Sequence, residues 1–508
     1  MDRINRRDFT ITLAGSLGLL APASRLPFLK TSRAQQKYTS VRRNVYCLNS
    51  YSPEIIAYKK AVEVMRARPT TDPTSWQAQA NIHGAFSPDA AHGIVNVCPP
   101  ATAANFVAPP GMIASVCRHD NFFLAWHRMY LYYFERIVRA ASGDPSFALP
   151  YWGYSPTGPH NLPALFRTPN TTANPLWTDQ RDPLINAGND IAPPSNVDAT
   201  NALSKSDFFT FQSTLSGVPH GAVHIATGDG CGWMSAFDTA GMDPIFWLHH
   251  ANIDRLWDDW IAMGGGRVNP TSNTAWMSQS FSFYDETGAT VSLRVDQILD
   301  AAAQLNYRYA PPTICPTRYR CFCIPLRPWL LDTLLIARID SIVHRPPLPG
   351  PYLAAQLPEP TSLRTIAREI RLPLSAETRR RVSALPHDSQ AGASFKLVLE
   401  DIRLVQRPGV AYEIYVNLPA GTKDTVYTSP HYIGTLDFFG SARPGAEPLR
   451  REFDLVHPFV RLQQMQRWQP DTIRITFVPR ALVQGRSVGK ALGQRPQATI
   501  GRMSVVIQ

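Results

Sequence analysis

The stretch DPIFWLHHANID, residues 243–254, decides the fold of the first half of the chain. Apolar residues recur at helical spacing from there to Ile261, which predicts a helix over 244–261. On that helix His250 and Asp254 stand four residues apart and share one face. A second predicted helix covers 126–139, and the intervening loops are rich in Pro, Asn and Thr. We therefore expect a helical core with irregular loops.

The last third of the chain has a different pattern. The segments 394–399, 412–416 and 472–478 alternate apolar with polar residues or are rich in β-branched ones, which predicts strands. They indicate an all-β domain, either a sandwich or a barrel. Before them, the Pro-rich run over 344–351 is typical of a linker.

These patterns predict the order of the domains. A signal segment over 1–34 precedes a catalytic domain over 38–335, a linker over 336–365 and a β-rich domain over 366–508.

The signal segment is typical of export. Arg3, Arg6 and Arg7 precede an apolar run over 11–20, and this layout resembles a twin-arginine signal. The run is too short to span a bilayer, so we expect no stable membrane insertion. An exported protein, periplasmic or secreted, is the favoured interpretation. An ordinary secretion signal or a disordered terminus is the alternative.

The net charge of +11 raises the question of a nucleic-acid partner. The Lys and Arg residues are scattered, with no run longer than three, so we interpret the charge as a solvated surface. The seven cysteines fit an oxidising destination, where Cys47 and Cys98 can pair. For Cys315, Cys321 and Cys323, disulfide formation is favoured over a role in loading a soft metal ion.

Histidines are the main candidates for chemistry, because nine of the thirteen lie between His83 and His250. His220 and His224 are four residues apart and can bind one metal from one helical face, with His250 as a third ligand. Asp254 is then placed to orient a ring. Upstream, a second triad of His83, His119 and His127 is expected.

The type of ligand limits which metals the site can bind but does not identify one metal. Sites made of imidazoles alone suit copper, zinc, nickel or iron, and two adjacent triads favour copper chemistry with oxygen. A single histidine is more often an ordinary core or surface residue, and we interpret His92, His160 and the four histidines from His344 onward in that way.

These motifs resemble the tyrosinase and catechol oxidase family, or polyphenol oxidases, which share a binuclear copper site with hemocyanins. The segment 126–135 resembles the first copper signature of that family, and 243–254 matches the second. The resemblance implies two bound copper ions, with His83, His119 and His127 on the first ion and His220, His224 and His250 on the second. His249 is then a neighbour and not a ligand.

The resemblance extends beyond the motifs. The segments 282–286 and 305–309 resemble the end of the catalytic domain in plant polyphenol oxidases, and 394–508 more loosely resembles their C-terminal β-domain. It implies a four-helix-bundle core around the copper pair. Phe237 matches an aromatic gate above the metals, with an ordinary core aromatic as the alternative. Gly221 and Ile225 would line the entrance.

Three departures from the family pattern bear on the site. His119 and His127 are eight residues apart where nine is usual, which a loop can absorb. Cys117 stands two before His119, as in members that form a thioether, with a free thiol or a disulfide as the alternative. Ser216 stands where plant enzymes often have a glutamate that helps to deprotonate phenols, and we expect no carboxylate to replace it nearby. This third departure favours the oxidation of diphenols over the hydroxylation of monophenols.

The function implied is copper-dependent oxidation of o-diphenols to o-quinones, with molecular oxygen as co-substrate. The alternatives are a tyrosinase that hydroxylates monophenols, an o-aminophenol oxidase, and an oxygen carrier like hemocyanin. A small phenol would bind in a dry pocket, for which the sequence offers five aromatic residues: Phe123, Trp126, Phe237, Phe246 and Trp247. We also expect the β-domain to keep the enzyme latent until proteolysis, with a stability or assembly module as the alternative. The oligomeric state stays open.

Overall fold

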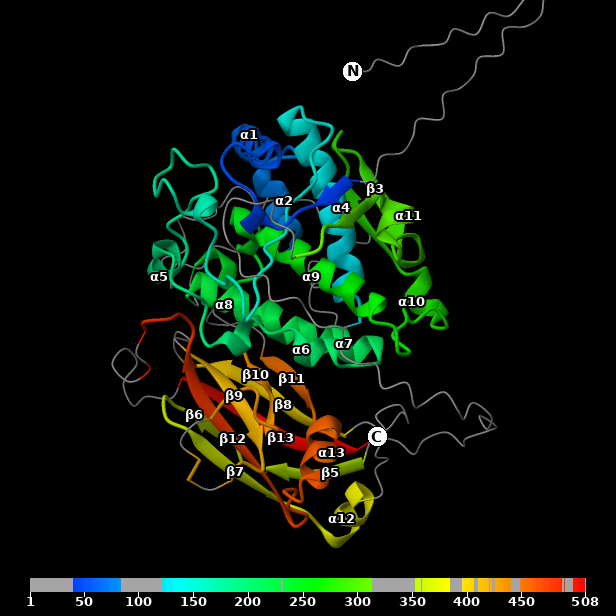
Figure 1. The fold of residues 1–508 in the computed structure, drawn as a ribbon. Helices are drawn as coiled ribbons and strands as arrows, with labels where there is room; N and C mark the ends of the chain where they lie inside the picture. The colour runs from blue at the N-terminus through cyan, green and yellow to red at the C-terminus, as the bar shows by residue number, and fades with distance from the viewer. Residues whose placement is uncertain are drawn as a thin grey trace, which may run out of the picture. The chain divides into compact units, whose positions relative to one another are not determined.

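The chain folds into a helical part followed by a β part (Figure 1). The computed structural model describes residues 40–83, 121–229, 232–312, 352–357, 359–383, 395–405, 410–419, 421–422, 425–439, 448–486, 488 and 497–507. The signal segment, Cys117 and His119 lie outside these residues. So do all the cysteines except Cys47. Cys47 is disulfide-bonded, so its pairing with Cys98 stays a prediction.

The helical part contains longer helices joined by short turns of helix. The α-helices are α1 (Pro53–Ala67), α2 (Trp76–His83), α4 (Phe123–Ser142), α5 (Pro183–Ala187), α6 (Thr200–Leu203), α7 (Phe208–Leu215), α8 (Ala222–Gly228), α9 (Pro244–Ala262), α10 (Thr274–Ser278) and α11 (Ala301–Leu305). A π-helical segment, η7 (Ser216–Gly221), joins α7 to α8. The 3-10 turns are η1 (Val45–Cys47), η5 (Ala164–Phe166), η6 (Pro194–Val197), η8 (Trp233–Ser235), η9 (Ala240–Met242) and η10 (Val295–Gln297).

Helices α4 and α9 confirm the two helices predicted from the sequence. Helix α9 begins at Pro244, and proline suits this position because the N–H groups of the first helical turn have no partner within the helix. The Asp243 side chain caps the helix by accepting a hydrogen bond from the Ile245 amide. Arg181 holds that carboxylate in a fully buried ion pair of 2.6 Å. Helix α4 ends at Gly143, whose φ of +75° closes the helix in the left-handed region.

Two small sheets border the helices. Strand β1 (Ser40–Arg42) pairs in parallel with β4 (Tyr307–Tyr309), and β2 (Ser280–Tyr284) pairs antiparallel with β3 (Thr290–Arg294). The first pairing joins the start of the described chain to the end of the helical part. It places Arg42 and Tyr309 side by side.

The β part is a sandwich of two sheets, which decides between the two architectures that the strand pattern allowed. One sheet has the order β10-β9-β12-β7 and the other β11-β8-β13-β5, with β6 also paired to β13. The strands are β5 (Tyr352–Leu357), β6 (Thr361–Leu363), β7 (Arg368–Pro373), β8 (Phe395–Leu404), β9 (Val410–Val416), β10 (Tyr432–Leu436), β11 (Leu449–Asp454), β12 (Thr472–Ala481) and β13 (Ala498–Ile507). Their inward side chains form one apolar core.

The β part differs from the sequence prediction in two ways. Strands β5 and β6 lie inside the segment 336–365 that was assigned to the linker, and they are strands because β13 supplies their hydrogen-bond partners. The part is also not all-β, because it contains α12 (Ala376–Ser383) and α13 (Val456–Gln464). Helix α13 buries Phe459 and Leu462 in the core of the sandwich.

Strand β9 is buried on both faces. Alternate residues such as Tyr412 and Ile414 point into the sandwich core, whereas Ala411 belongs to the core of the helical part. Between them, Glu413 accepts a hydrogen bond of 2.7 Å from the hydroxyl of Ser195 in η6. A strand covered on its second face needs a partner layer, and here the helical part is that layer.

Candidate metal centre

Six described histidines converge from five elements of the helical part. His83 is the last residue of α2, and His127 lies in the second turn of α4. His220 belongs to η7 and His224 to α8, whereas His249 and His250 are consecutive in α9. The chain is helical from Pro219 onward after a break at Val218, so His220 and His224 share a face as predicted, and their rings lie 4.7 Å apart.

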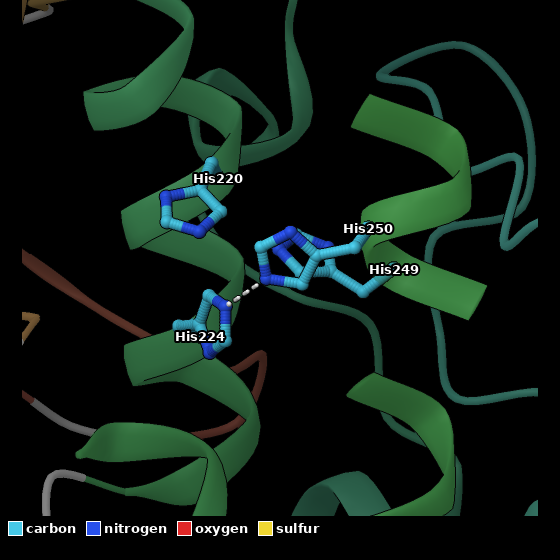
Figure 2. A group of neighbouring side chains, drawn as sticks. All are labelled: His220, His224, His249 and His250. Carbon is cyan, nitrogen blue, oxygen red and sulfur yellow. Dashed lines mark hydrogen bonds between the residues drawn. The ribbon is translucent and has the colours of Figure 1, made fainter. Parts of the chain in front are cut away.

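The histidines form two groups whose ring nitrogens lie within 4.8 Å of one another. One group contains His83, His127 and His250. The other contains His220, His224, His249 and His250, and Figure 2 shows these four rings facing one another between two helical segments. The predicted first triad is described only in part, because His119 is outside the described residues.

Backbone carbonyls orient four of these rings through Nδ1. The pairs are His83 with Phe237 at 2.6 Å, His127 with Phe123 at 2.7 Å, His220 with Ser216 at 2.8 Å and His224 with Met234 at 2.8 Å. A carbonyl oxygen only accepts, so Nδ1 carries the proton and Nε2 keeps its lone pair. That tautomer is the one a metal ligand needs.

Burial keeps these rings uncharged. It lowers the pKa of His83 to about 4 and the pKa of His220 to about 3. Burial, together with neighbouring histidines, also lowers the pKa values of His127, His224 and His250 well below the ordinary range. The site therefore presents neutral imidazoles at neutral pH, which is the form that binds a metal.

Several buried ring nitrogens lack a protein partner within the described residues. They include Nε2 of His127 and of His220 and Nδ1 of His250. The Nε2 atoms of His224 and His250 face each other at 3.3 Å, and the ring of His250 stacks on that of His127 at 4.2 Å. Buried ring nitrogens that have no hydrogen-bond partner, and that point toward one another, are suited to binding a cation between them.

An aromatic wall surrounds the rings. Phe123 lies 4.7 Å from His220, Phe246 lies 4.4 Å from His250, and Trp126 lies 4.8 Å from His127, measured between ring centroids. Phe237 lies 5.9 Å from His83. The expectation for Trp247 was wrong, because its ring stacks on Phe134 at 3.4 Å in the core behind the site.

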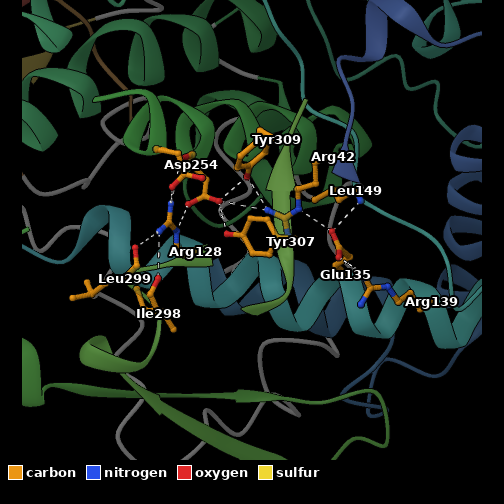
Figure 3. A network of polar contacts seen from close by, with 11 residues as sticks. Arg42, Arg128, Glu135, Arg139, Leu149, Asp254, Ile298, Leu299, Tyr307 and Tyr309 are labelled. Atoms are coloured by element: carbon orange, nitrogen blue, oxygen red, sulfur yellow. Dashed lines mark hydrogen bonds and ion pairs between the residues drawn. The ribbon is translucent and has the colours of Figure 1, made fainter. Parts of the chain in front are cut away.

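Among the described residues, the hydrogen-bond partners of Asp254 are not histidines, in contrast to the role predicted for it. Its carboxylate accepts hydrogen bonds of 2.6 Å from Arg128, Tyr307 and Tyr309 (Figure 3). Although burial opposes ionisation, Arg128 and Arg42 outweigh it and hold the pKa of Asp254 below its usual value. Asp254 therefore anchors α9 to α4 and to β4.

The β part reaches the site through one loop that the sequence did not reveal. Phe439 stacks on the ring of His224, with centroids 3.9 Å apart and planes 18° apart, and lies 4.6 Å from Phe237. Asp437 comes with it, and a Cβ at Gly221 would lie 2.5 Å from its Oδ1. Asp437 therefore leaves no room for a side chain at Gly221. A carboxylate therefore does approach Ser216–Gly221, from far along the chain.

Comparison with known sequences decides the family. Residues 73–175 and 158–263 match the common central domain of tyrosinase, and residues 271–319 match the polyphenol oxidase middle domain. The chain belongs to the tyrosinase and polyphenol oxidase family. The β part of this family member matches a domain of unknown function over residues 353–508.

Relatives of this polyphenol oxidase family member come from bacteria and plants. A tyrosinase from Hahella sp. (strain CCB-MM4) is 34% identical over 53% of this chain and 63% of its own length. Catechol oxidase B from Solanum tuberosum is 31% identical over 53% of this chain and 48% of its own. The latent form of polyphenol oxidase from Prunus armeniaca is 27% identical over 71% of this chain and 60% of its own length. The chain thus spans between about half and two thirds of these relatives.

Solved structures share the fold of this family member across both parts. A latent aurone synthase (polyphenol oxidase) superposes with a TM-score of 0.60 at 21% identity, covering 93% of this chain and 90% of that chain. A latent apple tyrosinase gives a TM-score of 0.57 at 22% identity, covering 92% and 97%. The order of a helical part and a β-sandwich is therefore common to these proteins.

Proposed function

We propose that the protein binds two copper ions and oxidises o-diphenols to o-quinones with molecular oxygen. The observation that carries the proposal is the pair of buried groups of neutral imidazoles, whose donor set suits copper. Relatives named catechol oxidase and polyphenol oxidase support the same reaction. The proposed ligands are His83, His119 and His127 for one ion and His220, His224 and His250 for the other.

The protein's own part in this reaction is orientation and exclusion of water. Bound copper would supply two one-electron redox centres beside a site for oxygen. The Nδ1 contacts with Phe237, Phe123, Ser216 and Met234 fix four rings before any metal arrives. The aromatic wall keeps the site dry and offers flat surfaces to a planar phenol. Cys117 as a thioether partner of His119 stays part of the proposal.

The β part is proposed to hold the enzyme latent. Phe439 covers His224 and contacts Phe237, so it lies where a phenol would have to approach the second group. Two hydrogen bonds hold Asp437 and Phe439 in place: Asp437 accepts from the Phe439 amide at 3.0 Å and from Arg451 at 3.2 Å. Gly221, Ile225 and Phe237 would line the entrance only once this loop has left.

Copper content measured together with oxygen uptake tests the proposal. We expect two copper ions per chain and uptake with a catechol that rises after cleavage between the two parts. A monophenol and an o-aminophenol tested beside the catechol separate the three enzyme alternatives. Copper binding with oxygen uptake that stops after one equivalent, with no turnover of the catechol, would instead make the protein an oxygen carrier.

Destination and partners complete the proposal. The signal segment over 1–34 is proposed to direct export to the periplasm or the medium, through the twin-arginine pathway. Within the described residues, no helix combines the length and apolar character that crossing a membrane requires. The proposed partner is a small phenol, with no nucleic acid.

A further inference from the structure

A cluster of polar side chains lies at one end of the sandwich and shares no residue with the two histidine groups. Strands β10, β9 and β12 lie side by side there, and β9 ends where β10 and β12 begin (Figure 1). The Val416 amide donates to the His431 carbonyl at 2.8 Å, and the Asn417 amide donates to the Arg474 carbonyl at 2.7 Å. The strand ends therefore bring His431, Asn417 and Arg474 together.

Two further arginines act on His431 from α13 and from the turn that follows this helix. Burial lowers the pKa of His431, and the positive charges of Arg467, Arg474 and Arg461 lower it further. A charge has to be close to a side chain to shift its pKa, so the three guanidinium groups lie near this ring. We call these four residues and Asn417 the basic cluster.

Carboxylates beside the basic cluster already have other partners. Arg474 approaches Glu369 only to 3.8 Å, and Glu369 binds another arginine at 2.9 Å. Asp454 attracts Arg461 but pairs with a lysine at 2.8 Å. Within the described residues, neither Arg461 nor Arg467 forms an ion pair. The basic cluster thus carries more positive charge than these carboxylates offset.

Buried donors of the basic cluster also lack acceptors within the described residues. Oδ1 of Asn417 accepts from the Arg474 amide at 2.9 Å, which fixes the orientation of the side-chain amide and leaves Nδ2 as a donor without a partner. Nε of Arg474 is buried without a partner as well. Asn417 is only 2% exposed, so water does not reach it from outside. Buried donors beside unpaired guanidinium groups are suited to an oxyanion.

His431 distinguishes between oxyanions. Its Nδ1 lies 2.9 Å from the Val416 carbonyl, which can only accept, so the proton of the neutral ring is on Nδ1. Nε2 then has a lone pair, and it is buried without a hydrogen bond within the described residues. The ligand therefore has to bring negative oxygen atoms for the arginines and one O–H for His431. Inorganic phosphate carries both at neutral pH, whereas sulfate and carboxylates have no proton to donate.

An open space borders the basic cluster. Arg461 and Tyr432, the residue after His431, line the cavity of about 510 Å³ between the helical part and the β part. A small ion in this cavity would meet Arg461 directly. The cavity thus gives a phosphate ion a way to approach the cluster.

We propose that the basic cluster binds inorganic phosphate. Its negative oxygens accept from Arg461, Arg467, Arg474 and Nδ2 of Asn417, and its O–H donates to Nε2 of His431. The bound ion would link α13 and the turn after it to the ends of three strands. The site uses none of the proposed metal ligands, so it does not rest on the proposed copper chemistry.

Isothermal titration calorimetry of the copper-loaded full chain, at pH 7.5 and constant ionic strength, tests this site. We expect phosphate to bind at least about tenfold more tightly than sulfate, because only phosphate can donate to His431. Arg467→Gln should weaken phosphate binding about tenfold, the loss expected for one hydrogen bond to a charged group. His431→Leu should weaken phosphate binding and remove the preference over sulfate.

Glycerol phosphate separates the free ion from a phosphate ester. The second pKa of a phosphate ester is near 6, so at pH 7.5 the ester has mostly lost its O–H and should bind more weakly than inorganic phosphate. Tighter binding of the ester would overturn the choice of the free ion.

Arg364→Gln is the matched control. Arg364 is an exposed arginine whose carbonyl accepts from the Tyr412 hydroxyl at 3.0 Å, near the start of β9 and not at its end. Its removal costs the same charge, so phosphate affinity should stay nearly unchanged. Equal losses in Arg467→Gln and Arg364→Gln would reveal a general effect of charge and overturn the inference. Phosphate bound at copper would give no loss in Arg467→Gln, which would overturn it too.

A folding failure of His431→Leu does not remove the test. Arg467 is exposed, so Arg467→Gln disturbs no packing, and its phosphate affinity relative to Arg364→Gln then decides the outcome. Equal affinities of the wild type for phosphate and sulfate, or no binding of phosphate at millimolar concentrations, would also overturn the inference.

Discussion

The helical part and the β part bury polar groups in different ways. In the helical part, Arg42, Arg128, Glu135 and Asp254 form a fully buried ion network whose members all belong to that part (Figure 3). The β part meets it through ion pairs that keep some exposure, such as Lys205 with Asp454 at 2.8 Å, and around a cavity of about 510 Å³. The histidine geometry is thus built within the helices, whereas the cover is an added surface.

This difference teaches which part is separable. A core ion network with a missing member leaves a charge in the interior, which proteins tolerate poorly. The contact between the parts is made by ion pairs that keep slight exposure, such as Lys205 at 3% and Asp454 at 14%, and by the Phe439 ring, so we expect it to cost less to open. Changes within the helices should therefore damage the site or the fold, and changes at the contact should mainly change how often the site is covered.

Removing a proposed ligand has the largest expected effect. His224→Ala deletes a ring that the Met234 carbonyl orients, so the copper content should fall from two ions to about one. Catechol oxidation should drop by more than roughly a hundredfold, which is the upper loss typical for removing only a group that supports a metal ligand. Metal analysis and oxygen uptake measure both. His160→Ala is the control, because its ring contacts the Gly158 carbonyl away from the groups. Full activity in His224→Ala would contradict the metal assignment.

Breaking the buried network comes next. Asp254→Asn leaves Arg128 and Arg42 without their shared carboxylate, and the free energy of unfolding should fall by about 3–5 kcal/mol. Denaturant unfolding of the metal-free chain gives the value. Asp258→Asn is the matched control, since Asp258 also pairs with Arg128 but is 37% exposed and should cost much less. Equal losses in the two variants would break the contrast between buried and half-exposed pairs.

Acid should loosen the contact between the parts by about 2 kcal/mol. Burial would raise the pKa of Asp454, but the hydrogen bond from His457 and the charge of Lys205 outweigh it and hold that pKa well below its usual value. A carboxyl with a lowered pKa stabilises the folded state above its unfolded pKa near 4, and this stability is lost as the pH falls further.

Lys205→Met tests that pH dependence. Resistance to proteolysis between the parts should fall between about pH 4 and pH 2 in the wild type, and this dependence should shrink in the variant. The exposed pair Arg502 with Glu400 provides the control, and Arg502→Met should leave the profile unchanged. Identical profiles for wild type and Lys205→Met would remove this pair from the contact.

Uncovering the site has the smallest expected effect. Phe439→Ala removes the ring from His224, so catechol oxidation by the uncut chain should rise about tenfold, in proportion to the open fraction. The assay compares uncut and cleaved protein. Phe438→Ala serves as control, because Phe438 precedes Phe439 in the chain but packs in the sandwich core, against Tyr412. An unchanged ratio of cut to uncut activity in Phe439→Ala would sink the latency proposal.

The sequence by itself determined α4 and α9, three strands of the sandwich (β8, β9 and β12) and the shared helical face of His220 and His224. Period and spacing suffice there, because residues four apart on a helix share a face and alternating residues share a side of a strand. Spacing alone does not separate a ligand from a neighbour in the His249 and His250 pair, and it was the resemblance to the family that implied His250 as the ligand.

Only the tertiary structure decided what approaches these histidines from far along the chain. Phe439 and Asp437 reach the second group from more than 200 residues away, and β5 and β6 become strands only because β13 pairs with them. Asp254 likewise binds Arg128 and two tyrosines where its helical spacing had suggested a histidine. Local periodicity places a side chain on a face, but packing between distant segments decides what that face meets.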